Sequence, residues 1–266
     1  MAKKIGFIGT GNMGSALARA ARRVIPGECI LLANRTAEKS MSLAKELGAE
    51  AVSNLDIAMS ADYVVLGVKP QMMADLMAQL APALLLRQEP YVLVSMAAGI
   101  SIERLKKMTT ADTPVIRIMP NTPCAIGEGI VLYTCSPEVQ PGELAAFLAV
   151  LSGGGRCVEL EEARFDAGGA ISGCGPAFAA LFIEALADGG VACGLPRTSA
   201  EELAAQMLSG TAKLMLESGS HPGALKDAVC SPGGTTIQGV RTLENAGFRG
   251  AVMEAVIAAW EKNRAL

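Results

Sequence analysis

The feature that most constrains this chain is a set of three spaced glycines close to its start. A short apolar segment, residues 5–8, leads into Gly9, Gly11 and Gly14, and small residues that suit a helix follow. A G-x-G-x-x-G turn between a strand and a helix is typical of dinucleotide-binding folds. Gly9 permits a sharp turn, Gly11 lets a pyrophosphate approach the backbone, and Gly14 lets the helix lie close to the strand. A glycine turn that binds nothing is the alternative, and the setting between strand and helix favours the binding site.

Composition bounds the class of protein. The 266 residues suffice for one large domain or two ordinary ones, and 51% of them are hydrophobic. The net charge of −3 argues against a nucleic-acid partner. No signal-peptide pattern is present, and the longest uncharged stretch, residues 167–183, is interrupted by glycines and a proline and is short for a membrane span. We therefore expect a soluble, cytoplasmic protein with no membrane partner.

The cysteines and the histidine do not form a metal-binding pattern. None of the seven cysteines belongs to a C-x-x-C pair, and His221 is the single histidine. We therefore expect no metal site and free thiols in a reducing compartment. In its Ser-His-Pro-Gly turn, His221 is expected to order the loop rather than to catalyse.

The first part of the chain, residues 1–160, alternates between strand and helix signals. A continuous apolar run of the kind found in buried parallel strands occurs at residues 62–68, and residues 91–95 and 114–118 are further expected strands. This alternation predicts an α/β domain with a Rossmann-type, doubly wound parallel sheet.

From residue 161 the strand signals stop. Long segments rich in Ala, Leu, Glu and Met follow at residues 178–191, 198–217 and 247–263. They predict a second, smaller, all-α domain over residues 161–266.

The choice between dinucleotides depends on the end of the second strand. About 20 residues after the glycine turn, an NAD site usually has an Asp or Glu that binds the ribose 2′-hydroxyl. Here the chain has Asn34, followed by Arg35 and Thr36. A neutral amide does not repel a 2′-phosphate, and a guanidinium can bind it in a bidentate manner. A solvated loop arginine is the alternative, and the spacing favours NADP(H) over NAD(H), with use of both left open.

Other cofactor contacts are expected beyond the carboxyl ends of the parallel strands. The expected cofactor-binding residues are Gly9, Gly11, Asn12, Met13, Gly14, Asn34, Arg35, Thr36, Asn54, Val68, Lys69, Pro70, Ala97, Ala98 and Asn121. Among them Lys69 has less support than the glycines, since a lysine at a strand end is often solvated.

One segment of the helical half differs from ordinary core sequence. Ser231 and a proline precede Gly233 and Gly234, and Thr235 and Thr236 then begin a helix. Exposed backbone and free N–H groups at a helix start can bind a substrate carboxylate. An ordinary capped helix explains the spacing equally well.

Several motifs, in order, resemble the pyrroline-5-carboxylate reductase family. They are residues 6–14, 67–70, 119–123, 172–177, 184–190 and 221–236. The resemblance covers nearly the whole chain, and the Ser-Pro-Gly-Gly-x-Thr segment is highly specific to that family. Cys174 departs from it, because the family usually has a small hydroxyl residue there.

The resemblance implies an enzyme that reduces 1-pyrroline-5-carboxylate to L-proline, with NAD(P)H delivering a hydride to the C=N carbon. It implies a nicotinamide near Ala97, Ala98 and Asn121. Ser231 and the N–H groups of the Gly233–Thr235 turn would hold the substrate carboxylate, and Thr236 would lie near the ring nitrogen. Ser231 and Thr236 are thus the expected catalytic residues. A homodimer through the helical domain is also implied, with larger rings of dimers left open.

Two other functions remain to be compared with this one. Another NADP-dependent reductase, of the β-hydroxyacid dehydrogenase or imine reductase kind, usually needs a catalytic lysine or aspartate in the helix after the sheet. Residues 173–178 of this chain contain neither. A non-catalytic dinucleotide sensor is the second alternative, and the presence of Ser231 and Thr236 argues against it.

Overall fold

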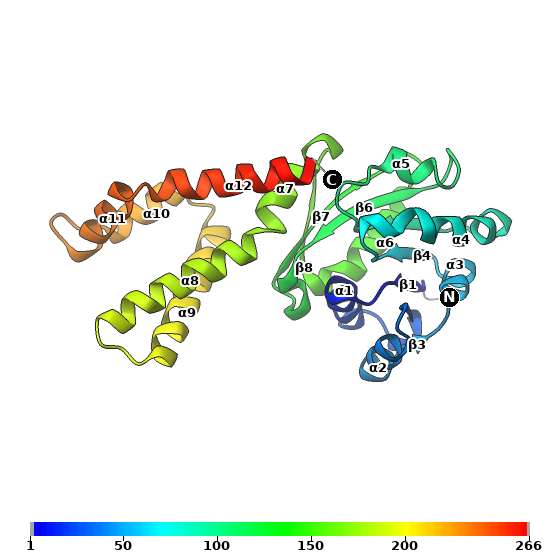
Figure 1. Cartoon of the computed structure of the whole chain (residues 1–266), viewed down its shortest axis with the longest axis horizontal. Helices are drawn as coiled ribbons and strands as arrows, with labels where there is room; N and C mark the ends of the chain where they lie inside the picture. Colours follow the sequence, from blue (N-terminus) through cyan, green and yellow to red (C-terminus); the bar gives the residue numbers. More distant parts are fainter. Residues whose placement is uncertain (1–2, 265–266) are drawn as a thin grey trace. The chain divides into compact units, whose positions relative to one another are not determined.

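The computed structural model describes residues 3–264, which divide by their contacts into two units (Figure 1). The first unit holds residues 3–173 together with 260–264, and the second holds residues 174–259. Contacts therefore divide the chain after Gly173. The domain boundary expected after residue 160 rests on the end of the strand signals and stays a prediction.

A twisted sheet lies at the centre of the first unit. Within the described residues it has eight strands in the order β3-β2-β1-β4-β5-β6-β7-β8. The strands are β1 (Ile5–Ile8), β2 (Ile30–Ala33), β3 (Glu50–Ala51), β4 (Tyr63–Leu66), β5 (Val92–Ser95), β6 (Val115–Pro120), β7 (Gly129–Cys135) and β8 (Gly155–Glu159). The strands β1 to β6 are all parallel, which confirms the predicted fold class.

The last two strands run the other way. β7 pairs antiparallel with β6, and β8 pairs parallel with β7. The reason is the connection between β6 and β7, which contains only the short 3₁₀ helix η3 (Thr122–Ile126). A parallel pair needs a crossover of a dozen or more residues, so this short link reverses the chain. The parallel part of the sheet therefore ends at β6.

Helices cover both faces of the sheet. The helices of the first unit are α1 (Asn12–Arg22), α2 (Ala37–Leu47), α3 (Asn54–Ser60), α4 (Met73–Leu86), α5 (Ile102–Lys106), α6 (Pro141–Leu151) and α7 (Phe165–Ser172). Buried side chains of α1, α2 and α6 form one core with the sheet, and those of α3, α4 and α5 form the other. Two cores on opposite faces make the sheet doubly wound, as predicted.

Local sequence explains where these elements begin. All four residues of β4 are buried, as expected for a continuous apolar strand covered on both faces. At the start of α3, the Ser53 hydroxyl accepts from the Asp56 N–H at 3.1 Å, and the Asp56 carboxylate accepts from the Ser53 N–H at 2.9 Å. This reciprocal cap makes Asn54 the first residue of α3.

A buried arginine ties α7 to the sheet of the first unit. Arg117 on β6 forms ion pairs of 3.3 Å with both Glu162 and Asp166, and its guanidinium stacks on the ring of Phe165. Glu162 also accepts a hydrogen bond from the Ile102 N–H at the start of α5. These contacts explain why α7 belongs to the first unit rather than to the helices that follow it.

Short 3₁₀ helices complete the connections of the first unit. Besides η3 they are η1 (Gly27–Cys29), η2 (Pro70–Met72), η4 (Ser152–Gly154) and η5 (Glu162–Arg164).

The second unit is helical, as predicted. Its helices are α8 (Gly175–Ala192), α9 (Arg197–Ser218), α10 (Pro222–Val229), α11 (Thr235–Asn245) and most of α12 (Phe248–Arg264). α8 packs on α9, and the apolar side chains of this unit that are buried in the described residues are the small ones of Ala187, Ala200 and Ala204. Large apolar side chains such as Leu181 and Leu203 stay 66% and 59% exposed in the single chain.

One helical stretch, residues 162–192, is long and apolar enough by length and composition to cross a membrane. It spans η5, α7 and α8, and 17% of its most apolar window is buried. A helix that a second protein chain covers has the same composition, so this feature indicates an apolar face and does not identify what covers it.

Candidate dinucleotide and substrate sites

The glycine turn has the geometry that its sequence predicts. Gly9 has a φ of +101°, and a Cβ there would lie 2.6 Å from the carbonyl oxygen of Gly67. A Cβ on Gly14 would overlap the carbonyl oxygen of Gly9. In contrast, beyond Gly11 and its two chain neighbours, no atom of the described residues lies within 4 Å of the position that a Cβ on Gly11 would take. Gly9 and Gly14 therefore serve packing, whereas Gly11 leaves open space at the backbone.

This open space fits a dinucleotide pyrophosphate. Gly11 is the N-cap of α1, and no side chain caps that helix end. The first N–H groups of a helix have no partner within the helix, so those of α1 can bind an anion. The residues at this turn thus fit the group that the G-x-G-x-x-G spacing predicts.

A cleft of about 450 Å³ lies at the carboxyl ends of β1, β2 and β4. Eight of the expected cofactor-binding residues line it, namely Gly9, Gly11, Asn34, Arg35, Thr36, Asn54, Val68 and Lys69. These residues come from four separate segments, which follow β1, β2, β3 and β4, so the fold brings together residues that the sequence keeps more than 50 positions apart, such as Gly9 and Lys69. Arg35 is exposed and forms no ion pair with any residue of 3–264, so its guanidinium is available to a ligand.

Asn34 is hydrogen-bonded at both ends of its amide. Its Oδ1 accepts from the Thr10 N–H at 3.2 Å, and its Nδ2 donates to the carbonyl oxygen of Thr36 at 3.1 Å. The Thr10 carbonyl in turn accepts from the Ser15 hydroxyl at 3.0 Å. The glycine turn and the turn that carries Arg35 are therefore joined by a side chain.

Several residues that line the cleft were not predicted from the sequence. They are Ile8, Lys39, Gly67, Met72, Asp75, Leu76 and Gln79. Lys39 had a signal, since it follows Arg35 by four residues and lies in the first turn of α2. The residues of α4 had none, because only the folded chain shows which face of that helix reaches the cleft.

Seven expected cofactor residues do not line this cleft. Met13, Gly14 and Pro70 belong to the adjacent α1 and η2, while Ala97 and Ala98 follow β5. Ala97 is buried, and its N–H donates to the Ser95 hydroxyl at 3.3 Å.

Asn12 lines a second hollow of about 680 Å³ beside the glycine turn, between α1 and α2. The bidentate ion pair of Arg19 and Glu46, with bonds of 2.7 and 2.8 Å, joins the two helices there. Hydrogen bonding from Arg19 lowers the pKa of the Glu46 carboxyl.

Asn121 uses its amide oxygen within the protein. Its Oδ1 accepts from the Ile130 N–H at 2.9 Å and lies 3.7 Å from the Cys124 sulfur. These contacts hold η3 against β7, so the side chain shapes its own loop. Whether Ala97, Ala98 and Asn121 contact a nicotinamide stays a prediction.

The expected substrate-binding segment lies in the second unit, between α10 and α11. Gly233 has a φ of +71°, and the Gly234 N–H donates to the Ser231 carbonyl at 3.0 Å. A Cβ on Gly234 would overlap the Ser231 hydroxyl, so a glycine here lets that hydroxyl lie over the turn. No side chain caps α11, and Ser231, Thr235 and Thr236 are exposed. The segment thus presents hydroxyls beside free N–H groups.

His221 acts as the predicted loop residue. It is the N-cap of α10, and its Nδ1 accepts from the Gly223 N–H at 3.0 Å. Elsewhere among residues 3–264, no three His, Cys, Asp or Glu side chains gather in a way that could hold a metal ion.

The chain is similar to known proteins along its whole length. Residues 162–266 match the model of the pyrroline-5-carboxylate reductase dimerisation family, and residues 4–99 match that of the coenzyme F420-dependent NADP oxidoreductase family. Pyrroline-5-carboxylate reductase of Escherichia coli is 39% identical over 100% of this chain and 99% of the relative. The soybean enzyme, from Glycine max, is 41% identical over 98% and 95%.

Solved structures agree with these relatives. Pyrroline carboxylate reductase of Plasmodium falciparum with NADP bound is 33% identical, with a TM-score of 0.88 over 99% of this chain and 97% of that one. The 1-pyrroline-5-carboxylate reductase of Streptococcus pyogenes is 34% identical, with a TM-score of 0.86 over 99% and 98%.

Proposed function

Because the chain belongs to the pyrroline-5-carboxylate reductase family, we propose that it reduces 1-pyrroline-5-carboxylate to L-proline with NADP(H) as its cofactor. This is the final step of proline biosynthesis. The observation that carries the proposal is similarity over the full chain, which includes both the dinucleotide cleft and the segment from Ser231 to Thr236.

NADP(H) is favoured by the chemistry of the cleft. Arg35 and Lys39 both line it, and Asn34 replaces the carboxylate that would repel a 2′-phosphate. The relative from Plasmodium falciparum has NADP bound, which supports the same cofactor here. Gly11 leaves space for the pyrophosphate, and NADH is the alternative donor that the assay below compares.

The substrate carboxylate is held by the turn before α11. The Ser231 hydroxyl and the N–H groups of the Gly233–Thr235 turn form an anion site, and the dipole of α11 favours the negative charge. The Thr236 hydroxyl orients the ring nitrogen by a hydrogen bond. Ser231 and Thr236 are the side chains that we assign to substrate binding and catalysis.

The chemistry is balanced by one hydride and one proton. Bound NADPH supplies the hydride that adds to the C=N carbon, and the ring nitrogen carries the proton. An imine that is protonated in solution already accepts a hydride well, so the chain needs no strong general acid. Its residues act by holding and orienting the substrate, an effect that can contribute on the order of 7–11 kcal/mol.

The second unit supports a homodimer. Its large apolar side chains remain exposed in the single chain, and its residues match the dimerisation model of the family. Assembly of dimers into larger rings is a further part of the proposal. We also propose a cytoplasmic location without membrane or nucleic-acid partners, with the apolar stretch of residues 162–192 covered by a second copy of the chain.

To test the proposal, the purified full-length chain is mixed with NADPH and 1-pyrroline-5-carboxylate, and the absorbance of the reduced nicotinamide is followed over time. Rapid loss that requires both substrate and enzyme, with L-proline as the product, is the expected result. The same assay with NADH gives the cofactor preference. If NADPH binds but absorbance does not fall, the substrate assignment fails and another reductase or a sensor takes its place.

A further inference from the structure

Asn34 occupies the position at which a dinucleotide fold selects its cofactor, yet both ends of its amide are engaged by the protein. The Thr10 N–H needs an acceptor and the Thr36 carbonyl needs a donor, so these partners fix the orientation of the amide. An aspartate would keep the first bond and would face the Thr36 carbonyl with a second acceptor. An alanine would lose both bonds.

Thr10 is the residue through which this contact acts on the glycine turn. It is 5% exposed, and side chains bind both of its backbone polar groups: Asn34 accepts from its N–H, and Ser15 donates to its carbonyl. The preceding Gly9 N–H donates to the Ala33 carbonyl at 2.8 Å. Gly9 and Thr10 are therefore fastened to the end of β2 by one backbone bond and one side-chain bond.

Thr36 is the residue through which the contact acts on the second phosphate-binding segment. It follows Arg35 directly and is the N-cap of α2, whose first turn contains Lys39. The Thr36 side chain does not cap this helix. The hydrogen bond from the Asn34 amide to the Thr36 carbonyl therefore fixes the turn in place of a side-chain cap. Arg35 lies between the two residues that this bond joins.

We propose that Asn34 is a positioning residue that joins the pyrophosphate-binding turn to the 2′-phosphate-binding turn, so that the two sites bind one cofactor cooperatively. The proposal rests on the proposed NADP(H) function. If Asn34 acted only by its lack of charge, it would affect only the binding of the 2′-phosphate. The proposed hydrogen bonds instead hold the two turns in the free protein, so they also affect the binding of a dinucleotide that lacks the 2′-phosphate.

The test is a double-mutant cycle with Asn34→Ala, Arg35→Ala and the double variant, measured as NADPH and NADH dissociation constants by nicotinamide fluorescence. Arg35→Ala should weaken NADPH by about tenfold or more and leave NADH unchanged. Asn34→Ala should weaken both dinucleotides, by about tenfold for two lost hydrogen bonds. In the Asn34→Ala background, the Arg35→Ala effect on NADPH should shrink to about threefold, since the turn no longer holds the guanidinium in place.

A second arm needs no cofactor. Amide exchange at Thr10, resolved by NMR of the free full-length protein, should be at least about tenfold faster in Asn34→Ala. It should stay slow in Asn34→Asp, which keeps the acceptor, and in Asn54→Asp, which places the same charge in the cleft and touches neither bond. These variants also control for folding, because they retain the Thr10 bond.

The outcomes separate the inference from the function. If wild type binds neither dinucleotide, the proposed function fails, and the exchange arm still decides whether Asn34 holds the turn. If wild type binds NADPH but Asn34→Ala leaves the NADH dissociation constant unchanged, Asn34 acts only locally and the inference is overturned. The same holds if the fold-changes of Asn34→Ala and Arg35→Ala in the NADPH dissociation constant simply multiply in the double variant. Unchanged Thr10 exchange in Asn34→Ala would overturn it as well.

Discussion

The α-carbon of Gly14 lies so close to the carbonyl oxygen of Gly9 that a Cβ on Gly14 would overlap this oxygen. Gly11, between them, has open space on its side-chain face. One motif thus contains glycines of two kinds, since Gly9 and Gly14 allow the strand, turn and helix to pack, and Gly11 leaves room for a ligand.

The first prediction separates these two kinds. Gly14→Ala should lower the free energy of unfolding by roughly 1–3 kcal/mol, because the new methyl group overpacks the turn. Gly11→Ala should destabilise the fold less than Gly14→Ala does, and it should weaken NADPH by roughly tenfold or more, since the methyl group enters space kept for the pyrophosphate. Thermal unfolding and NADPH titration check both variants. Normal NADPH affinity in Gly11→Ala would contradict the assignment of that space.

The second prediction concerns the two cations of the cleft. Arg35→Ala and Lys39→Ala should each weaken NADPH by roughly tenfold and change NADH little, because only NADPH carries the 2′-phosphate. Lys45→Ala is the matched control, since Lys45 lies on α2 and lines neither hollow. Dissociation constants at low and high salt give the measurement. Equal losses for both dinucleotides would mean that neither cation contacts the 2′-phosphate.

Much of the first unit could be predicted because its signals are local. A glycine turn between strand and helix has few uses, and a short strand buried on both faces, such as β4, is predominantly apolar. The reversal at β7 was not predictable in the same way. It follows from the short connection between β6 and β7, and no strand was predicted at residues 129–135 that could pair with β6.

In the candidate site, too, the sequence predicted the residues next to strand ends and missed those that only the folded chain brings there. Residues beside a strand end, such as Arg35 and Lys69, were found from their position in the sequence. Gln79 was not, because it reaches the cleft from the middle of α4, and packing decides which face of that helix points to the cleft. For Asn34 and Asn121 the sequence identified the residues, and the folded chain added the hydrogen bonds that their amides make to the protein.

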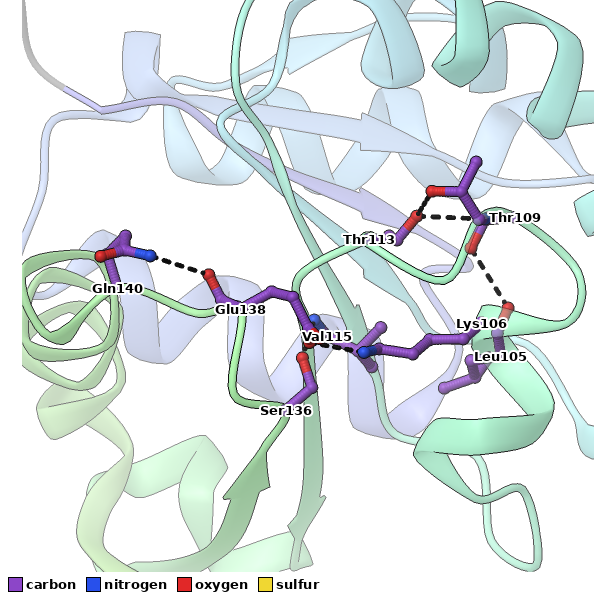
Figure 2. A network of polar contacts seen from close by, with 9 residues as sticks. Leu105, Lys106, Thr109, Thr113, Val115, Ser136, Glu138 and Gln140 are labelled. Carbon is purple, nitrogen blue, oxygen red and sulfur yellow. Dashed lines mark hydrogen bonds and ion pairs between the residues drawn. The ribbon is translucent and has the colours of Figure 1, made fainter.

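The third prediction is a pH dependence of stability, from a network at the start of β6 (Figure 2). Lys106 on α5 forms an ion pair with Glu138, and hydrogen bonds from Lys106 and then Ser136 lower the pKa of Glu138 from 4.5 to about 2. A carboxyl whose pKa is lower in the folded state stabilises the fold above its unfolded pKa. This contribution should disappear as the pH falls from about 5 to about 2.

Urea unfolding over that pH range tests the network. Glu138→Gln should be less stable than wild type at neutral pH, and the difference should shrink on acidification until it vanishes near pH 2. Glu50→Gln is a suitable control, because Glu50 is exposed on β3 and has no ion-pair partner among residues 3–264. A difference between Glu138→Gln and wild type that does not depend on pH would contradict the assigned ion pair.

The fourth prediction concerns the hydroxyl at the start of α11. Thr236→Ala should lower the turnover number by roughly 10- to 100-fold and leave the NADPH dissociation constant unchanged, since the hydroxyl is proposed to act on the substrate nitrogen. Thr242→Ala is the control on the same helix, where the hydroxyl only donates to the Gln238 carbonyl at 3.0 Å. Steady-state kinetics and NADPH titration give the two readouts. Unchanged turnover in Thr236→Ala would remove its catalytic assignment.

The last prediction concerns the exposed apolar face of α9. Leu203, Met207 and Leu214 follow one another at spacings of four and seven residues, so they lie on one side of the helix, and they are 59%, 47% and 55% exposed in the single chain. Three large apolar side chains in a row are costly to leave in water, and burial of each is worth roughly 1.5–3 kcal/mol. A second copy of the chain, which the family model of this region favours, would cover them.

Met207→Glu should therefore convert the dimer into a destabilised monomer, because it places an unpaired charge in the interface. Ser209→Glu, an equal change on the opposite side of α9, should leave the dimer intact. Sedimentation of both variants and wild type over a range of concentrations measures the state of assembly. A wild-type chain that remains a folded monomer at every concentration would contradict the dimer, and dissociation by both variants would show that the interface is not confined to this face of α9.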